Sequence, residues 1–136
     1  MKTNLTINEI SKTIYDLLTE RGYSPDYTDS YQLGFECMIC DKKFSFYPIE
    51  DEVFGFSAEF NLKQAPSESE RERLERIFML GDPEDCIFEN LHIDGSFACI
   101  SSAFTTDLYS DVMPGLIIET LESPEGIAAE LFKLEA

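Results

Sequence analysis

The stretch from Tyr31 to Leu62 reads YQLGFECMICDKKFSFYPIEDEVFGFSAEFNL, and it predicts the class of fold. It contains three runs in which apolar and polar residues alternate, as they do along a β-strand whose side chains point to opposite faces in turn. Two short charged turns separate the runs, Asp41-Lys42-Lys43 and Glu50-Asp51-Glu52. We therefore expect an antiparallel meander with strands at about 31–40, 44–49 and 54–62.

One face of this meander is strongly apolar. The alternation places on it Tyr31, Leu33, Phe35, Cys37, Ile39, Phe54, Phe56, Ala58, Phe60 and Leu62. The opposite face also carries apolar side chains, namely Met38, Tyr47, Ile49 and Val53. Because a few short helices can cover only one face, we expect part of the second face to form an interface.

One helix is expected before the meander in the sequence and another after it. Thr6 and Glu9 form a capping box that opens a helix over about 7–21, which Gly22 ends. Residues 23–30 lack any period and are expected to form a loop. Ser67 and Glu70 form a second capping box, which opens a helix through Leu80, with Gly81 after it.

The last third begins with a hairpin and ends with helices. Asp94-Gly95 is a strong two-residue turn signal between strands Cys86–Ile93 and Ser96–Phe104. Phe97 and Phe104 are expected to join the apolar face. Helices are expected from Pro114 to Leu121 and, after a Ser123-Pro124-Glu125 cap, through about Lys133.

These elements predict one α+β domain spanning residues 1–136. The expected order is α-β-β-β-α-β-β-α, with an antiparallel sheet of about five strands and helices packed against it. The sequence contains no internal repeat and no linker long enough to divide it.

The composition is strongly acidic. Asp and Glu number 27 against 10 Lys and Arg, so the formal net charge is −17. Such a charge repels phosphate backbones and anionic lipid, which argues against a nucleic-acid or membrane-surface role. It favours solubility or a basic partner.

The N-terminal sequence predicts a cytoplasmic protein. It has no apolar run of signal-peptide length, and no run in the chain approaches a membrane span. We therefore expect the four cysteines to be reduced thiols without a structural disulfide.

Three features could carry chemistry, and each has a simpler interpretation. Cys37-Met38-Ile39-Cys40 has zinc-knuckle or redox spacing, but residues three apart on a strand point to opposite faces. His92 lies beside a turn without an activating context for Ser101 or Ser102. The acidic turns lack the spacing of a calcium loop. We predict no catalytic, cofactor or metal site.

The order of elements, the size and the acidity from Ile7 to Phe132 resemble the type III secretion chaperone family and the related YbjN-type domains. The resemblance implies an antiparallel sheet with helices packed on it and a homodimer. It also implies that an extended polypeptide segment binds along apolar surface without enzymatic chemistry.

We therefore expect a noncatalytic, chaperone-like protein that holds a segment of a protein partner on an apolar sheet or helix surface. One alternative is an acidic inhibitor or immunity-type protein that masks a basic partner, and another is a small enzyme with an unrecognised site. The expected partner-binding or dimer interface lies on the second helix and the hairpin after it, at Leu74, Ile77, Phe78, Phe88 and Leu91.

Overall fold

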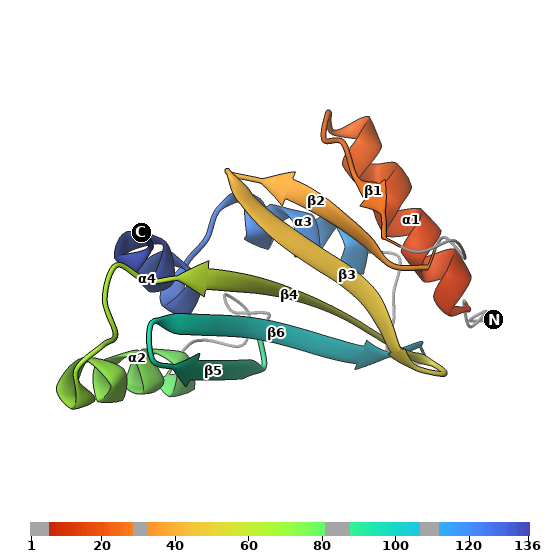
Figure 1. Cartoon of the computed structure of the whole chain (residues 1–136). Helices are drawn as coiled ribbons and strands as arrows, with labels where there is room; N and C mark the ends of the chain where they lie inside the picture. The colour runs from red at the N-terminus through yellow and green to blue at the C-terminus, as the bar shows by residue number, and fades with distance from the viewer. Residues whose placement is uncertain (1–5, 29–32, 81–87, 107–111) are drawn as a thin grey trace.

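The fold is a single antiparallel sheet with helices packed on one side (Figure 1). The computed structural model describes residues 6–28, 33–80, 88–106 and 112–136. Within these ranges the elements are α1 (Ile7–Glu20), β1 (Asp26–Tyr27), β2 (Phe35–Ile39), β3 (Lys42–Glu50), β4 (Val53–Asn61), α2 (Glu68–Leu80), β5 (Asn90–Asp94), β6 (Phe97–Thr105), α3 (Met113–Glu122) and α4 (Gly126–Leu134). The predicted α+β class is confirmed.

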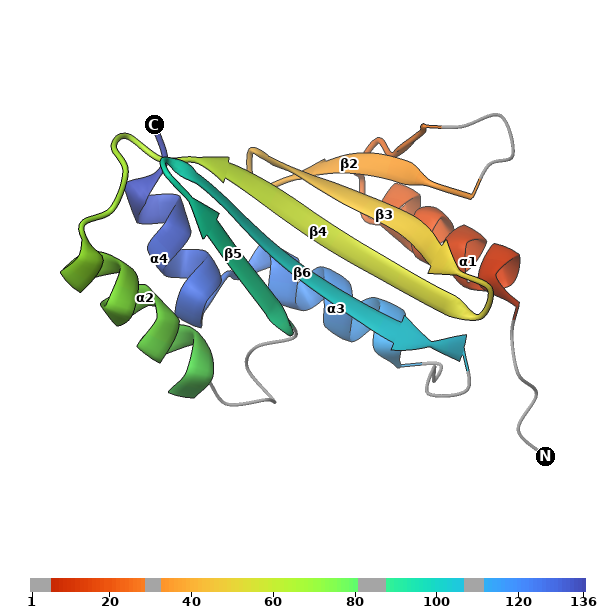
Figure 2. The same cartoon turned by 60° about the horizontal axis from the view of Figure 1, so that its bottom comes forward.

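The strands lie in the order β1-β2-β3-β4-β6-β5, and every neighbouring pair is antiparallel. Helices α1 and α3 lie behind the sheet in Figure 2, and α4 lies at its β5 edge beside α2. Phe132 of α4 packs on Phe60 of β4, with ring centroids 5.3 Å apart, on the same face. The helices therefore cover one face of the sheet, which we call the covered face. We call the other the open face.

Over the described ranges the sheet has six strands and not about five, because a short strand forms inside the predicted loop 23–30. Asp26 pairs with Glu36 and Tyr27 with Phe35. The Tyr27 ring also stacks on Tyr15 of α1, with centroids 4.4 Å apart. Two residues are too few to show a period, so alternation could not reveal this strand. Tyr31 and the start of the first predicted strand lie outside the described residues.

Two of the hairpin turns in the described residues, β2–β3 and β5–β6, differ from prediction by about one residue. Ile39 pairs with Lys42, so the first turn is Cys40-Asp41, where φ is 54° and 63°. Positive φ at both central positions marks a type I′ turn, whose twist suits a two-residue hairpin.

In the β5–β6 hairpin Asp94 pairs with Phe97, which makes Gly95-Ser96 the turn. Gly95 has φ of 59°, as the first central position of a type II′ turn requires. The expected Asp94-Gly95 turn and its register are therefore wrong by one residue.

The helix ends agree with prediction except at α4. The predicted Thr6 and Glu9 capping box is present, and the Glu70 amide donates to Ser67 Oγ. Helix α4 begins at Gly126 and not at Pro124. Ser123 instead ends α3 by donating its amide to the Glu119 carbonyl, and a residue before proline disfavours helical φ and ψ.

A row of aromatic rings crosses the covered face and forms the centre of the core. Phe35, Phe46 and Phe56 occupy paired positions on β2, β3 and β4, and each is at most 1% exposed. The centroids of Phe35 and Phe46 are 4.8 Å apart, and those of Phe46 and Phe56 are 5.9 Å apart. Tyr15 and Phe88 extend the row at its two ends. The predicted apolar face is thus confirmed over the described strands.

Phe97 is an exception to that prediction. Phe104 packs beside Phe54 on the covered face, with centroids 6.1 Å apart. Phe97 pairs with Asn61, so its side chain lies on the open face. The seven-residue separation between the two phenylalanines places them on opposite faces of one strand.

Lys42 is buried on the covered face and not in a turn as expected. Its ammonium donates to the Glu59 carbonyl oxygen at 2.9 Å and pairs with the Glu135 carboxylate. It also lies 4.2 Å from the Phe60 ring centroid, a cation–π distance. These contacts satisfy the buried charge and hold the segment after α4 against β4, where Leu62 bridges to Glu135.

A polar cluster joins the end of α1 to the end of α3. The Glu122 carboxylate accepts a hydrogen bond from the Tyr23 hydroxyl at 2.6 Å and pairs with Arg21 at 2.8 Å. The hydrogen bond to this carboxylate, with burial, raises the pKa of Tyr23 to about 12. The bond exists only while the phenol keeps its proton.

Gly55 supplies a test of how closely the strands pack. A Cβ there would lie 2.9 Å from the Ser102 carbonyl oxygen and 2.6 Å from Ile49 Cδ1. We expect Gly55→Ala to lower the free energy of unfolding by about 1–3 kcal/mol, as overpacking does. Gly115 in α3 has open space, so Gly115→Ala should instead raise it by about 0.5–1 kcal/mol. Urea unfolding measures both, and an unchanged Gly55→Ala protein would contradict the packing described.

The Tyr23 cluster predicts a pH-dependent contribution to stability. Because its pKa rises on folding from 10.0 to about 12, the folded state holds this proton more tightly. The contribution is therefore complete below pH 10 and is lost as the pH rises towards about 12. The stability difference between the wild type and Tyr23→Phe should shrink across that window, and urea unfolding at several pH values measures it. A difference that stays constant would contradict the bond to Glu122.

Candidate functional site

The open face is the surface of the sheet that no described helix covers. Its central side chains lie on β3, β4 and β6 and alternate with the buried ones. They are Ser45, Tyr47, Ile49, Val53, Gly55, Ser57, Phe97, Cys99, Ser101 and Ala103. The sequence predicts Met38, Tyr47, Ile49 and Val53 on this side, and the structure places them there.

The middle of the open face is built from small residues. Ser45, Ser57 and Ser101 occupy one row across three neighbouring strands. In the next row Tyr47, Gly55 and Ala103 are neighbours, and the Ile49 side chain lies over Gly55. The sheet is therefore shallow along the row of serines, and another backbone could approach it closely there. Sequence reasoning missed this feature, although the alternation alone places these small residues on one face.

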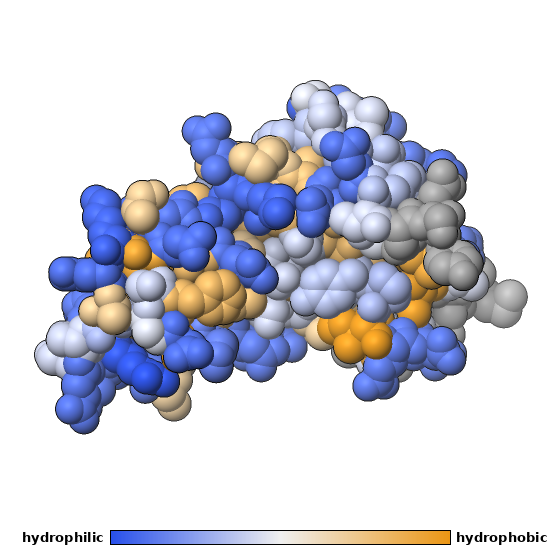
Figure 3. All heavy atoms as spheres, viewed as in Figure 1, coloured by the Kyte–Doolittle hydropathy of each residue, from blue (hydrophilic) through white to orange (hydrophobic). Residues whose placement is uncertain are grey.

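Apolar side chains gather at both ends of the shallow centre. Ile49 is 47% exposed and Val53 half-buried near the β3–β4 turn, while Phe97 is half-buried at the far end. Figure 3 shows hydrophobic surface near that turn and again at the opposite end, with weakly polar surface between. This arrangement suits contact with a polypeptide better than exposure to water.

A hollow of about 910 Å³ lies at the end of the sheet beside the β3–β4 turn. Among the described residues its apolar lining includes Ile7, Pro48, Ile49 and Val53. Its acidic lining is the turn segment Glu50-Asp51-Glu52. Apolar and acidic groups thus lie side by side at this end of the sheet, with Ile49 and Val53 on the open face.

The predicted interface residues occupy different positions. Leu74 is fully buried and Phe88 is 6% exposed, so both side chains belong to the core of this chain. Ile77, Phe78 and Leu91 are half-buried and pack against that core. The structure thus brings all five to the α2 and β5 side of the molecule, and a role for the half-buried three in an interface stays a prediction. The exposed apolar side chains of α2 are Met79 and Leu80, at 79% and 82%.

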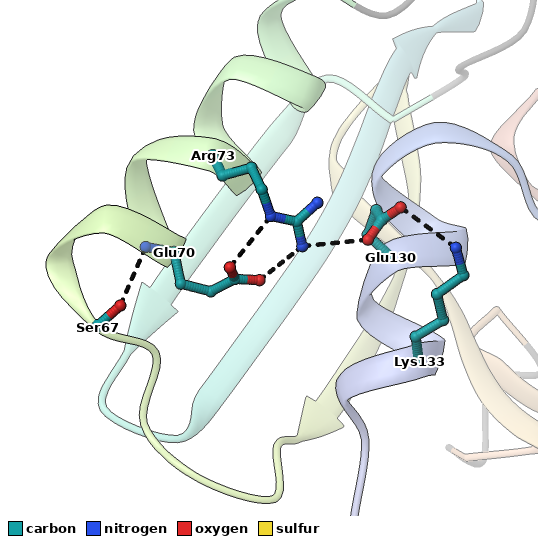
Figure 4. A network of polar contacts seen from close by, with 5 residues as sticks. All are labelled: Ser67, Glu70, Arg73, Glu130 and Lys133. Carbon is teal, nitrogen blue, oxygen red and sulfur yellow. Dashed lines mark hydrogen bonds and ion pairs between the residues drawn. The ribbon is translucent and has the colours of Figure 1, made fainter.

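A charged network on the same side is explained by helix packing. Arg73 of α2 pairs with Glu70 at 2.6 Å and with Glu130 of α4 at 3.2 Å, and Lys133 also pairs with Glu130 (Figure 4). These carboxylates raise the pKa of Arg73, and Arg73 lowers the pKa of Glu70. Because each charge has a partner, the network joins α2 to α4 without offering a free group to a ligand.

The three cysteines within the described residues do not converge on one site. Cys37 is buried and Cys40 exposed, with Cys40 Sγ donating to the Glu122 carbonyl at 3.1 Å. Burial raises the pKa of Cys37 to about 11 and that of Cys99 above its usual value. Cys86 lies outside the described residues. Within the described ranges no three His, Cys, Asp or Glu side chains form a group that could hold a metal ion.

Cys99 lies beside a histidine, the kind of base that can activate a cysteine nucleophile. The thiol stands between Glu59 and His92 in one row of the open face. Burial and the nearby Glu59 charge both raise the pKa of its thiol, whereas a nucleophilic cysteine needs a lowered pKa. The row therefore favours the protonated thiol as a packing group.

No helix in the described part of the chain is long and apolar enough to cross a bilayer. Comparison with known proteins finds no match to a protein-family model, to a curated protein or to a solved structure. The resemblance to type III secretion chaperones therefore stays a prediction, and the open face is the candidate functional site on geometry alone.

Proposed function

We propose that the protein is a noncatalytic, chaperone-like binding protein that holds a segment of a partner polypeptide against its open face. The observation that carries the proposal is the one-sided cover of the sheet. The helices bury the aromatic row, while the opposite face keeps Tyr47, Ile49, Val53 and Phe97 at its surface.

The shape of the open face supports the same function. Small side chains at Ser57, Ser101 and Ala103 let an incoming backbone approach, and the apolar groups at either end offer contact area. Apolar burial supplies the binding free energy, at roughly 25 cal/mol for each Å² removed from water. No bond needs to be made or broken in this role.

The proposal includes a cellular location and an oligomeric state. A cytoplasmic location fits the free thiols of Cys37, Cys40 and Cys99. We also propose a homodimer, as the resemblance to the chaperones implies. Met79 and Leu80 support it, because they give α2 an exposed apolar end.

Photo-crosslinking tests the proposal at single positions. We expect benzoylphenylalanine at position 47, replacing the half-buried Tyr47, to form a discrete adduct with a partner protein in native lysate. The control is the same group at position 116, because Leu116 is 53% exposed on α3. Equal adducts from both positions, or none from position 47, would contradict binding at the open face.

A further inference from the structure

The open face and its edges carry unbalanced charge. The exposed cation of this face is Lys43, and it pairs with Glu36 at 3.9 Å. Carboxylates surround the face at Glu59, Asp94 and the Glu50-Asp51-Glu52 turn, and all are exposed. In the described part of the chain none of these five forms an ion pair.

Several carboxylates on the helices do have a cation beside them. Lys12 pairs with Asp16 on α1, Arg71 with Glu75 on α2, and Arg21 with Glu122 of α3. Within the described residues most basic side chains are thus used on the helices, and the open face has Lys43 as its exposed cation against five unpaired carboxylates.

We infer that the occupant of the open face is a segment rich in lysine or arginine that also carries apolar side chains. This inference rests on the proposed function and names the chemistry of its partner. The apolar side chains pack on Tyr47, Ile49 and Val53, and the cations lie against the Glu50-Asp51-Glu52 turn. Charge complementarity of this kind speeds association and selects partners.

The backbone holds the acidic turn in place beside the apolar end. Glu52 has φ of 68°, and its carbonyl accepts a hydrogen bond from the Thr106 amide at 2.8 Å. Glu50 pairs with Val53 across the turn. The backbone of the turn is therefore anchored to both β4 and the end of β6, and it presents three exposed carboxylates beside Ile49 and Val53.

Three short fluorescein-labelled peptides probe the inference. One alternates lysine with valine, and the others replace every lysine by serine or by glutamate. Fluorescence anisotropy would be measured at about 50 mM and about 300 mM salt, where screening differs. We expect the lysine peptide to bind at least about tenfold more tightly than the serine peptide at low salt, and the difference to shrink at high salt.

Two pairs of variants locate the binding. Replacing Glu50, Asp51 and Glu52 by Gln, Asn and Gln should weaken lysine-peptide binding about tenfold and flatten its salt dependence. The control replaces exposed Glu20, Glu72 and Glu125 by Gln, which removes the same charge away from the open face. Ile49→Ser should weaken both the lysine and the serine peptides, whereas Leu116→Ser should weaken neither.

The outcomes separate this inference from the proposed function. If the lysine and serine peptides bind equally and both lose affinity in Ile49→Ser, the open face binds polypeptide without charge selection, and only the inference fails. If both charge-removal variants weaken binding equally, the turn is not the contact, and the inference also fails. A dimer in light scattering that Ile49→Ser dissociates would identify a second copy as the occupant and overturn it. Failure of every peptide to bind would overturn it as well, and the position 47 crosslink would then decide the proposed function separately.

Discussion

The aromatic row on the covered face is the constraint on which the rest of the structure depends. Phe35, Phe46 and Phe56 pack side by side across three strands only if those strands pair in the observed register. A slip of one residue would move each ring to the opposite face. The row also receives Tyr15 from α1, so it fixes the side on which the helix packs.

The side chains that form the core and those proposed to bind a partner therefore lie on opposite faces of the sheet. Since the rings and helices complete the core on one side, side chains on the open face are not needed to fill it. They can therefore differ in kind, and they do: the centre is small, the ends are apolar and the rim is acidic. A face with that combination fits a polypeptide ligand, and the proposed function follows from it.

Strand alternation predicted the long strands and most of the core, because burial on one face leaves a period of two in the sequence, and capping patterns predicted the helices. It could not place turns to the residue, since Cys40 is an unusual choice for positive φ. Nor could it distinguish the core from an interface at Leu74 and Phe88. An apolar residue has the same pattern whether its own chain or a partner covers it, and only the packing of α2 and β5 decides.

The most direct test compares two neighbouring aromatic residues on opposite faces of β3. Urea unfolding of Phe46→Ala should show a loss of about 3–5 kcal/mol, because it opens a cavity in the aromatic row. Tyr47→Ala should cost no more than about 1.5 kcal/mol, because its half-buried ring lies on the open face. Comparable losses for the two variants would contradict the division of the sheet into a face that folds the chain and a face left free to bind.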